Sequence, residues 1–266
     1  MSRINGFVGR RNLVKLMGLA GASAVVATAC NQSPKAEQPQ AQTQAPPAQP
    51  VVDPAAAQKV EKRPFADNMT PDQALELLME GNKRFTEQKS VHPRQNFARL
   101  TETGADQFPF ASFLSCADSR VPVEILFDQG VGDTFVVRVA GNVASPEGVG
   151  SLEFGSAVLG SRVIVVMGHE GCGAVNAVLR AQKLPAESKI GSLVPYIQPG
   201  VDQAKGQQGN DLVNAIKDNT LVQVETLKKS PILAGLVKEN KLKIVGAYYD
   251  LDTGKVEILK EKAAKA

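Results

Sequence analysis

VIVVMGHEGCGA, residues 163–174, is the stretch that decides the fold of this chain. Its first five residues form a short apolar run rich in β-branched side chains, and a glycine-rich turn and a helical pattern follow at once. An apolar run that ends in such a turn is typical of a buried strand that leads into a helix. The turn carries His169 and Cys172, so two metal-ligating residue types leave the predicted strand together.

A second stretch of the same form lies upstream, at residues 110–120, FASFLSCADSR. Here the apolar run ends on Cys116, and a short polar turn follows. Two such strands in one parallel sheet would place their polar residues at the same carboxyl edge, where open α/β sheets bind ligands. Zinc takes four tetrahedral ligands from cysteine, histidine and carboxylate, and a catalytic site keeps one position for water. Cys116, His169 and Cys172 are therefore the predicted zinc ligands.

Asp118 and Arg120 follow Cys116 closely and extend this predicted site. Asp118 is near enough to Cys116 to act as a fourth ligand or as a hydrogen-bond acceptor for a zinc-bound hydroxide. The planar guanidinium of Arg120 can grip this carboxylate with two parallel hydrogen bonds. Such pairing would hold Asp118 off the metal and leave the fourth position to water. The alternative for the two residues is an ordinary ion pair in a loop.

The two cysteines of the predicted body also admit other interpretations. Free cysteine often behaves as a small buried hydrophobic residue, and a disulfide is an option in an exported protein. A redox role is disfavoured because the sequence holds no C-x-x-C motif. A non-catalytic zinc-binding lipoprotein module would need a closed four-ligand site, for which Asp118 is the local candidate.

Composition limits the class of protein. The 266 residues suffice for one large domain or two small ones with a sizeable core, since 43% of them are hydrophobic. The absence of tryptophan, an aromatic fraction of 5% and a net charge of only +3 argue against a nucleic-acid partner.

Residues 1–30 have the character of a signal peptide of the twin-arginine type. The pair Arg10-Arg11 precedes an uncharged stretch of apolar and small residues at 16–29, which is shorter than the ~20 residues that a membrane span needs. A twin-arginine leader implies export of an already folded protein. The alternative is a chance arginine pair in an ordinary basic leader. We expect a periplasmic or otherwise extracytoplasmic protein.

Cys30 ends this leader and follows small residues, as the first residue of a mature lipoprotein does. Lipidation of Cys30 would anchor the protein to a membrane. A plain small-residue cleavage site at Thr28-Ala29 is the alternative. Residues 31–63 are dominated by proline, glutamine and alanine, which is typical of a disordered tether. The catalytic domain is predicted at 64–266.

Within this domain, predicted strands alternate with predicted helices. Thr70-Pro71 is a good helix start, and we expect this N-terminal helix to pack on a partner subunit. Alternation of this kind indicates an α/β fold with a mainly parallel central sheet flanked by helices. A C-terminal hairpin is predicted at one edge. The predicted strands are at 110–116, 134–139, 163–167, 243–249 and 255–259.

The motifs at 116–120 and 169–172 resemble the signature pair of the β-class carbonic anhydrases. Further segments resemble the same family, and the likeness extends over about residues 70–259. These segments are 128–130, 137–142, 150–153 and 246–250.

The resemblance implies one Zn²⁺ per chain on Cys116, His169 and Cys172, with Asp118 and Arg120 as the family's aspartate–arginine dyad. The implied reaction is the reversible hydration of CO₂ to bicarbonate and a proton, by attack of zinc-bound hydroxide on CO₂. A related hydrolase acting on CS₂ or COS would share this scaffold and metal set.

The resemblance also concerns Gln107 and Phe113. Gln107 stands nine residues before Cys116, at the spacing of a substrate-binding glutamine that the neighbouring subunit supplies in the family. A homodimer or higher even oligomer is therefore implied. Some members close the site through a bicarbonate pocket that uses a tryptophan; here Phe113 stands near that position. We expect the open, plant-like form without this switch.

Overall fold

The computed structural model describes residues 68–183 and 188–260. The predicted signal peptide with Cys30 and the predicted tether at 31–63 lie outside the described residues. Within the described part, no helix is both long enough and apolar enough to cross a membrane.

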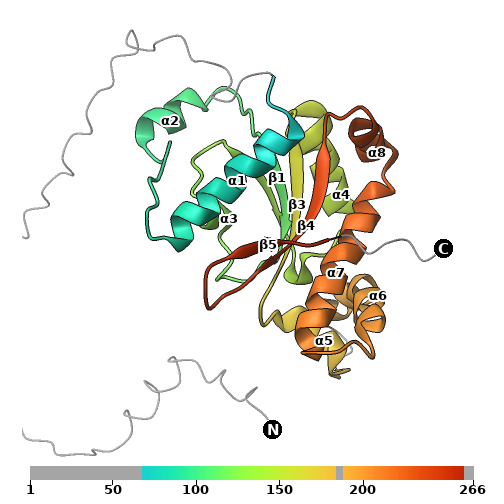
Figure 1. The fold of residues 1–266 in the computed structure, drawn as a ribbon. Helices are drawn as coiled ribbons and strands as arrows, with labels where there is room; N and C mark the ends of the chain where they lie inside the picture. Colours follow the sequence, from blue (N-terminus) through green and yellow to red (C-terminus); the bar gives the residue numbers. More distant parts are fainter. Residues whose placement is uncertain (1–67, 184–187, 261–266) are drawn as a thin grey trace, which may run out of the picture. The chain divides into compact units, whose positions relative to one another are not determined.

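A five-stranded sheet forms the centre of this region (Figure 1). Its strands lie in the order β2-β1-β3-β4-β5, and the first four run parallel while β5 is antiparallel to β4. The mainly parallel sheet and the C-terminal edge hairpin are thus confirmed. The bounds are β1 Ala111–Ser115, β2 Thr134–Arg138, β3 Val163–His169, β4 Lys243–Tyr249 and β5 Val256–Ile258.

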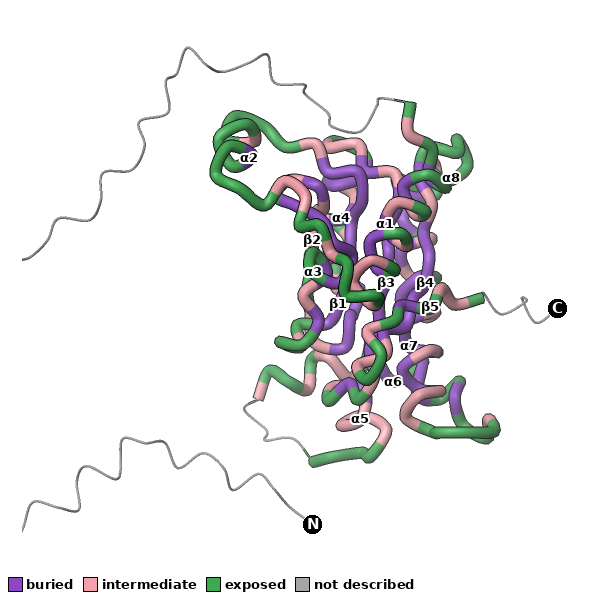
Figure 2. The backbone as a smooth tube through the Cα atoms, turned by 60° about the vertical axis from the view of Figure 1, so that its left-hand side comes forward, coloured by how far each residue is buried: buried purple, intermediate pink, exposed green. Residues whose placement is uncertain are grey.

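Helices cover both faces of the sheet. Side chains from alternate positions of β1 and β3 form one core with α1 and α3, and the intervening positions form another with α4, α7 and α8. Every residue of β1 and β3 is buried, as Figure 2 shows for the central strands. This burial explains why both strands are rich in apolar residues, with Ser112 and Ser115 as the buried polar residues of β1. The helices are α1 Pro71–Thr86, α3 Val123–Leu126, α4 Pro146–Glu153, α7 Asp211–Lys228 and α8 Pro231–Lys238.

The helix α1 begins as its sequence predicts. Thr70 accepts a hydrogen bond from the N–H of Gln73, and the Gln73 side chain accepts one from the N–H of Thr70. Ala74 and Leu78 on its inner face are fully buried in the chain's own core. These two residues therefore pack within the chain itself, in the core that includes β3 and α3. A partner contact by another face of α1 stays a prediction.

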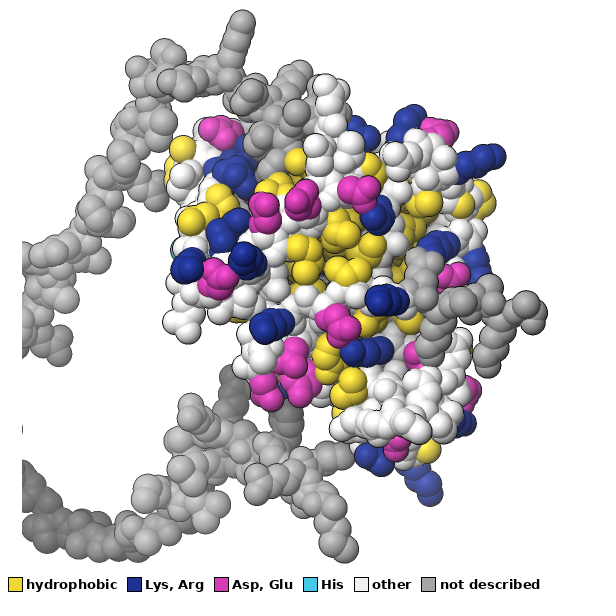
Figure 3. Space-filling view, in the orientation of Figure 1, with side chains coloured by type: hydrophobic (Ala, Val, Ile, Leu, Met, Phe, Trp, Pro, Cys, Tyr) yellow, Lys and Arg dark blue, Asp and Glu magenta, His cyan; other side chains and the backbone are white. Residues whose placement is uncertain are grey.

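Other hydrophobic residues near α1 are only partly buried. In the view of Figure 3, hydrophobic side chains gather on the face where α1 and β5 lie in Figure 1, below a row of acidic side chains. The partly buried residues that pack against this core are Met69, Leu75, Leu77, Met79, Phe85, Val136, Leu251 and Ile258.

A third cluster lies at the carboxyl edge of the sheet and includes Cys116, Cys172 and Ile197. It is built by α5 (Gly173–Leu179), α6 (Val194–Ala204) and the first half of α7. Residues 183–209 are mixed and polar in sequence, so their pattern does not predict α6. The short helix α2 (Phe97–Glu102) likewise lies in a mainly polar stretch of the sequence.

The buried carboxylate of Asp128 fastens the segment between α1 and α2. Asp128 accepts hydrogen bonds from Arg84 Nε at 2.7 Å and from the N–H groups of Val91 and His92 at 3.1 and 2.9 Å. Burial alone would raise the pKa of Asp128, but these three donors together hold it below its usual value. His92 is an exposed loop residue.

Candidate metal centre

Strand ends bring the three predicted ligands together. Cys116 directly follows β1, His169 is the last residue of β3, and Cys172 lies immediately before α5. One donor atom from each residue lies within 4.8 Å of the other two, and all three residues are buried. Because β1 and β3 are adjacent and parallel, their carboxyl ends place Cys116 and His169 side by side.

The two thiols are free and in contact. Cys116 Sγ lies 4.0 Å from Cys172 Sγ, and the N–H of Gly141 donates to Cys116 Sγ at 3.3 Å. The hydrogen bond from Cys172 lowers the pKa of Cys116 to about 4, although burial opposes this. The same bond and burial raise the pKa of Cys172. The pair thus holds one thiolate readily, and a metal ion would favour loss of the second proton.

His169 presents one nitrogen to these thiols. Its Nδ1 lies 2.8 Å from the carbonyl oxygen of Glu170, which can only accept, so Nδ1 carries the hydrogen. Nε2 is consequently the lone-pair nitrogen; it is buried and has no hydrogen-bond partner among the described residues. A buried acceptor left without a partner costs free energy. A metal ion bound by Nε2 and the two sulfurs would satisfy it.

Asp118 and Arg120 form the pair that the sequence predicts, beside the ligands. Arg120 donates through Nε and Nη2 to the two carboxylate oxygens at 2.9 and 2.8 Å, and its N–H donates to Oδ1 at 3.0 Å. These hydrogen bonds hold the pKa of Asp118 well below its usual range. Asp118 Oδ2 is still 3.8 Å from His169 Nε2. The carboxylate therefore lies near the ligands while Arg120 occupies its oxygens.

Arg138, at the end of β2, braces the turn after β1. Its Nε donates to the carbonyl oxygen of Cys116 at 3.1 Å, and its Nη2 donates to that of Asp118 at 2.5 Å. One guanidinium thus fixes the main chain on both sides of Ala117. The sequence did not single out Arg138, Gly141 or Glu170 as site residues, because the contact of each at the site involves a main-chain N–H or carbonyl group.

Gln107 is not brought to this cluster within the chain. It is exposed and precedes β1, whereas Cys116 follows that strand. Five residues of extended chain rise roughly 3.3 Å each, so the two residues lie at opposite ends of β1.

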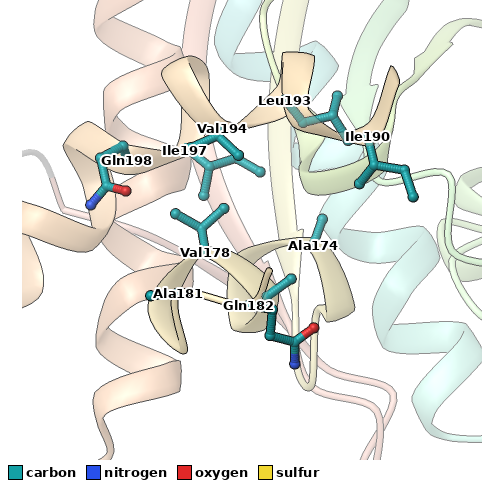
Figure 4. A pocket seen from close by; sticks show the side chains of 10 residues that line it. Ala174, Val178, Ala181, Gln182, Ile190, Leu193, Val194, Ile197 and Gln198 are labelled. Atoms are coloured by element: carbon teal, nitrogen blue, oxygen red, sulfur yellow. The ribbon is translucent and has the colours of Figure 1, made fainter. Parts of the chain in front are cut away.

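An apolar pocket of about 270 Å³ lies between α5 and α6 (Figure 4). Val178 and Ile197 point toward each other across it. A Cβ on Gly141 would lie 2.8 Å from Ile197 Cδ1 and 3.3 Å from the Cβ of Ala174. Gly141 therefore lies between the wall of this pocket and Cys116. The lining residues are Ala174, Ala177, Val178, Ala181, Gln182, Ile190, Leu193, Val194, Ile197 and Gln198.

The fold and site together define a class: an α/β protein with a Cys–His–Cys metal cluster and a clamped aspartate at the carboxyl edge of its sheet. The family model described as carbonic anhydrase matches residues 111–256. Carbonic anhydrase 2 of Mycobacterium tuberculosis is 37% identical over 71% of this chain and 92% of its own length. The carbonic anhydrase of Mycolicibacterium smegmatis is 37% identical over 72% and 94%.

A solved structure agrees with these relatives. The β-carbonic anhydrase CcaA is 26% identical and superposes with a TM-score of 0.54 over 70% of this chain and 95% of its own. This chain therefore belongs to the carbonic anhydrase family, in its β class. It is an enzyme of that family, whose reaction is the hydration of CO₂.

Proposed function

We propose that the chain catalyses the reversible hydration of CO₂ to bicarbonate and a proton with one Zn²⁺, held by Cys116, His169 and Cys172. The observation that carries this proposal is the buried cluster of three donors with Asp118 clamped beside it. Two thiolates and one neutral imidazole suit zinc, and three protein ligands leave its fourth position open.

Zn²⁺ bound there would supply a Lewis acid that makes water a nucleophile at neutral pH. The chain's own residues do the rest. Asp118 is ionised at neutral pH and can only accept a hydrogen bond. In the proposed mechanism it accepts the O–H of the nucleophile through Oδ2 and so directs a lone pair toward CO₂. Arg120 keeps this carboxylate from becoming a fourth ligand, which corresponds to the open form.

Gln107 is proposed to complete the site of a neighbouring subunit. Its exposure, and its place at the far end of β1 from its own Cys116, support a role in trans. The active unit would then be a homodimer or a higher even oligomer. The hydrophobic side chains gathered over α1 and β5 offer surface for such contacts.

Export is a separate part of the proposal and rests on the sequence alone. Arg10-Arg11 and the apolar stretch at 16–29 support a twin-arginine route to the periplasm or another extracytoplasmic space, with lipidation at Cys30. Intact mass of the mature protein and a Cys30→Ser variant test the lipid. A mass of the mature parent that fits cleavage without a lipid would refute lipidation at Cys30.

Stopped-flow CO₂ hydration by the zinc-loaded full chain tests the reaction, with Asp118→Asn as the variant and Asp202→Asn as the surface control. We expect fast hydration by the parent, a loss of at least about 100-fold for Asp118→Asn, and no loss for the control. Absence of hydration in a folded protein with one zinc per chain would refute the proposal. Turnover of CS₂ or COS by the same sample would then favour the hydrolase alternative.

A further inference from the structure

Glu170 is tied to the β4–β5 hairpin at two points. Its N–H donates to the carbonyl oxygen of Tyr249 at 2.8 Å, and its carboxylate oxygen Oε2 accepts from the N–H of Leu251 at 3.0 Å. Its own carbonyl oxygen receives Nδ1–H of His169 at 2.8 Å. The residue between two predicted ligands is therefore fastened to the far end of the chain.

We propose that Glu170 is a positioning residue for the metal site. By holding the N–H of Leu251, its carboxylate fixes the peptide whose carbonyl selects the tautomer of His169. This inference rests on the proposed zinc function, because the tautomer matters through the lone pair that it leaves on Nε2.

The need for such a restraint comes from the next residue. The direction of the Glu170 carbonyl depends on the torsions of Glu170 and Gly171. Gly171 adopts a φ of +63° and has no neighbouring atom within 4 Å of where its Cβ would be. Since glycine moves readily between backbone conformations, Gly171 itself contributes little to fixing this peptide. The restraint has to come from the Glu170 side, where Tyr249 and Leu251 supply it.

The tautomer decides whether His169 can bind a metal in the direction of the thiols. A neutral imidazole has one N–H and one lone pair. With Nδ1–H on the Glu170 carbonyl, the lone pair lies on the buried Nε2. If the carbonyl turned away, the N–H could move to Nε2, and zinc binding would first require its return.

Two substitutions separate the effect of the length of the Glu170 side chain from the effect of its negative charge. Glu170→Gln keeps an oxygen at the same distance along the side chain but removes the negative charge. Glu170→Asp keeps the charge but is shorter by one methylene, so it cannot reach Leu251 from the same backbone position. The exposed Glu225, whose carboxylate accepts a hydrogen bond from Lys228 at 3.2 Å, supplies the matched Gln and Asp controls.

The chain contains only two histidines, His92 and His169, so ¹⁵N-histidine NMR reads the tautomer of His169 directly, with the exposed His92 as internal reference. We expect the Nδ1–H form in the zinc-free full-length parent and in Glu170→Gln. In Glu170→Asp we expect a mixture of tautomers. Chelator competition should give a zinc affinity about 10-fold weaker for Glu170→Asp, the low end for groups that hydrogen-bond a metal ligand, and within about 2-fold for Glu170→Gln.

The outcomes separate this inference from the proposed function. The inference would be overturned if the parent and Glu170→Asp had the same tautomer populations of His169 and the same zinc affinity. It would also be overturned if Glu170→Gln lost as much zinc affinity as Glu170→Asp, because the charge of the side chain rather than its length would then matter. A parent that binds no zinc would instead overturn the zinc site itself. If Glu170→Asp does not fold, the same spectra of Glu170→Gln still decide, because loss of the Nδ1–H form there refutes the inference.

Discussion

Replacement of Gly141 by alanine tests the packing that supports Cys116. Gly141 has φ +73° and ψ 17°, the left-handed region, which costs a non-glycine residue roughly 1–2 kcal/mol. The new Cβ would also lie 2.8 Å from Ile197 Cδ1, and overpacking a full core costs roughly 1–3 kcal/mol. We therefore predict that Gly141→Ala lowers the free energy of unfolding by about 2–5 kcal/mol.

A second substitution separates the two causes. Ile197→Val removes Cδ1, the atom that the new Cβ would meet, while it leaves the backbone of Gly141 unchanged. Alone it should cost roughly 0.5–1.5 kcal/mol. Combined with Gly141→Ala it should relieve the overpacking, so the double-mutant cycle should show a favourable coupling of about 1–2 kcal/mol. The backbone cost should remain.

Urea unfolding of the zinc-loaded full chain measures these differences at one fixed zinc concentration. Gly150→Ala is the matched control, because Gly150 lies in α4 with nothing within 4 Å of its Cβ position; it should stabilise the helix by up to about 1 kcal/mol. A cost below about 1 kcal/mol for Gly141→Ala, or the absence of coupling with Ile197→Val, would refute the reasoning.

Three further predictions follow from the contacts of buried and clamped groups. Arg120→Lys removes the planar fork that holds Asp118, so kcat/KM should fall by at least about 10-fold in stopped-flow assays while the zinc content stays at one per chain. Asp128 has a pKa below its usual value in the folded protein. Its stabilising effect is therefore present above the unfolded pKa of about 3.9 and is lost as the pH falls through the folded pKa. Asp128→Asn should accordingly make the free energy of unfolding fall less steeply with decreasing pH. Removal of zinc should expose the two ligand thiols, whose sulfurs are 4.0 Å apart, to hydrogen peroxide. The peroxide would oxidise them to a disulfide and be reduced to water, and the intact mass would fall by two hydrogens.

Each of these has a contrary result. Unchanged kcat/KM in Arg120→Lys would show that the paired hydrogen bonds from Arg120 to Asp118 are not needed for catalysis. An acid limb equally steep in Asp128→Asn would mean that other carboxylates govern it. If Cys116 and Cys172 both remain titratable after peroxide treatment of the zinc-free protein, the third prediction is contradicted. The zinc-loaded protein serves as its protected control.

The central strands could be predicted because strands buried on both faces are built mainly from apolar residues, which the sequence shows directly. All residues of β1 and β3 are buried, so apolar residues predominate in both. The helix α6 could not be predicted, because it contains Pro199 in its interior and Gly200 beside it. Gly200 is needed there, since a Cβ would lie 2.4 Å from the Cα of Asn219 in α7. Packing of two helices, which the local sequence does not reveal, thus overrides the local signal.

The candidate site divides in a similar way. Cys116, His169 and Cys172 could be found because their side chains have distinctive chemistry at the ends of recognisable strands. The contacts that shape them involve a glycine N–H, the Glu170 carbonyl and two carbonyls held by Arg138. Every residue type carries such main-chain groups, so nothing in the side-chain pattern marks which of them will act.

The separation of the two cysteines along the chain has a consequence for unfolding. Cys116 and Cys172 are 56 residues apart, and a metal ion that joins them closes the intervening chain into a ring. A cross-link over a ring of this size lowers the entropy of the unfolded chain by an amount worth on the order of 4 kcal/mol, for as long as both thiolates remain bound. The ion would then cross-link the ends of β1 and β3, so that both the free energy of unfolding and the catalytic activity would depend on the two metal–thiolate bonds.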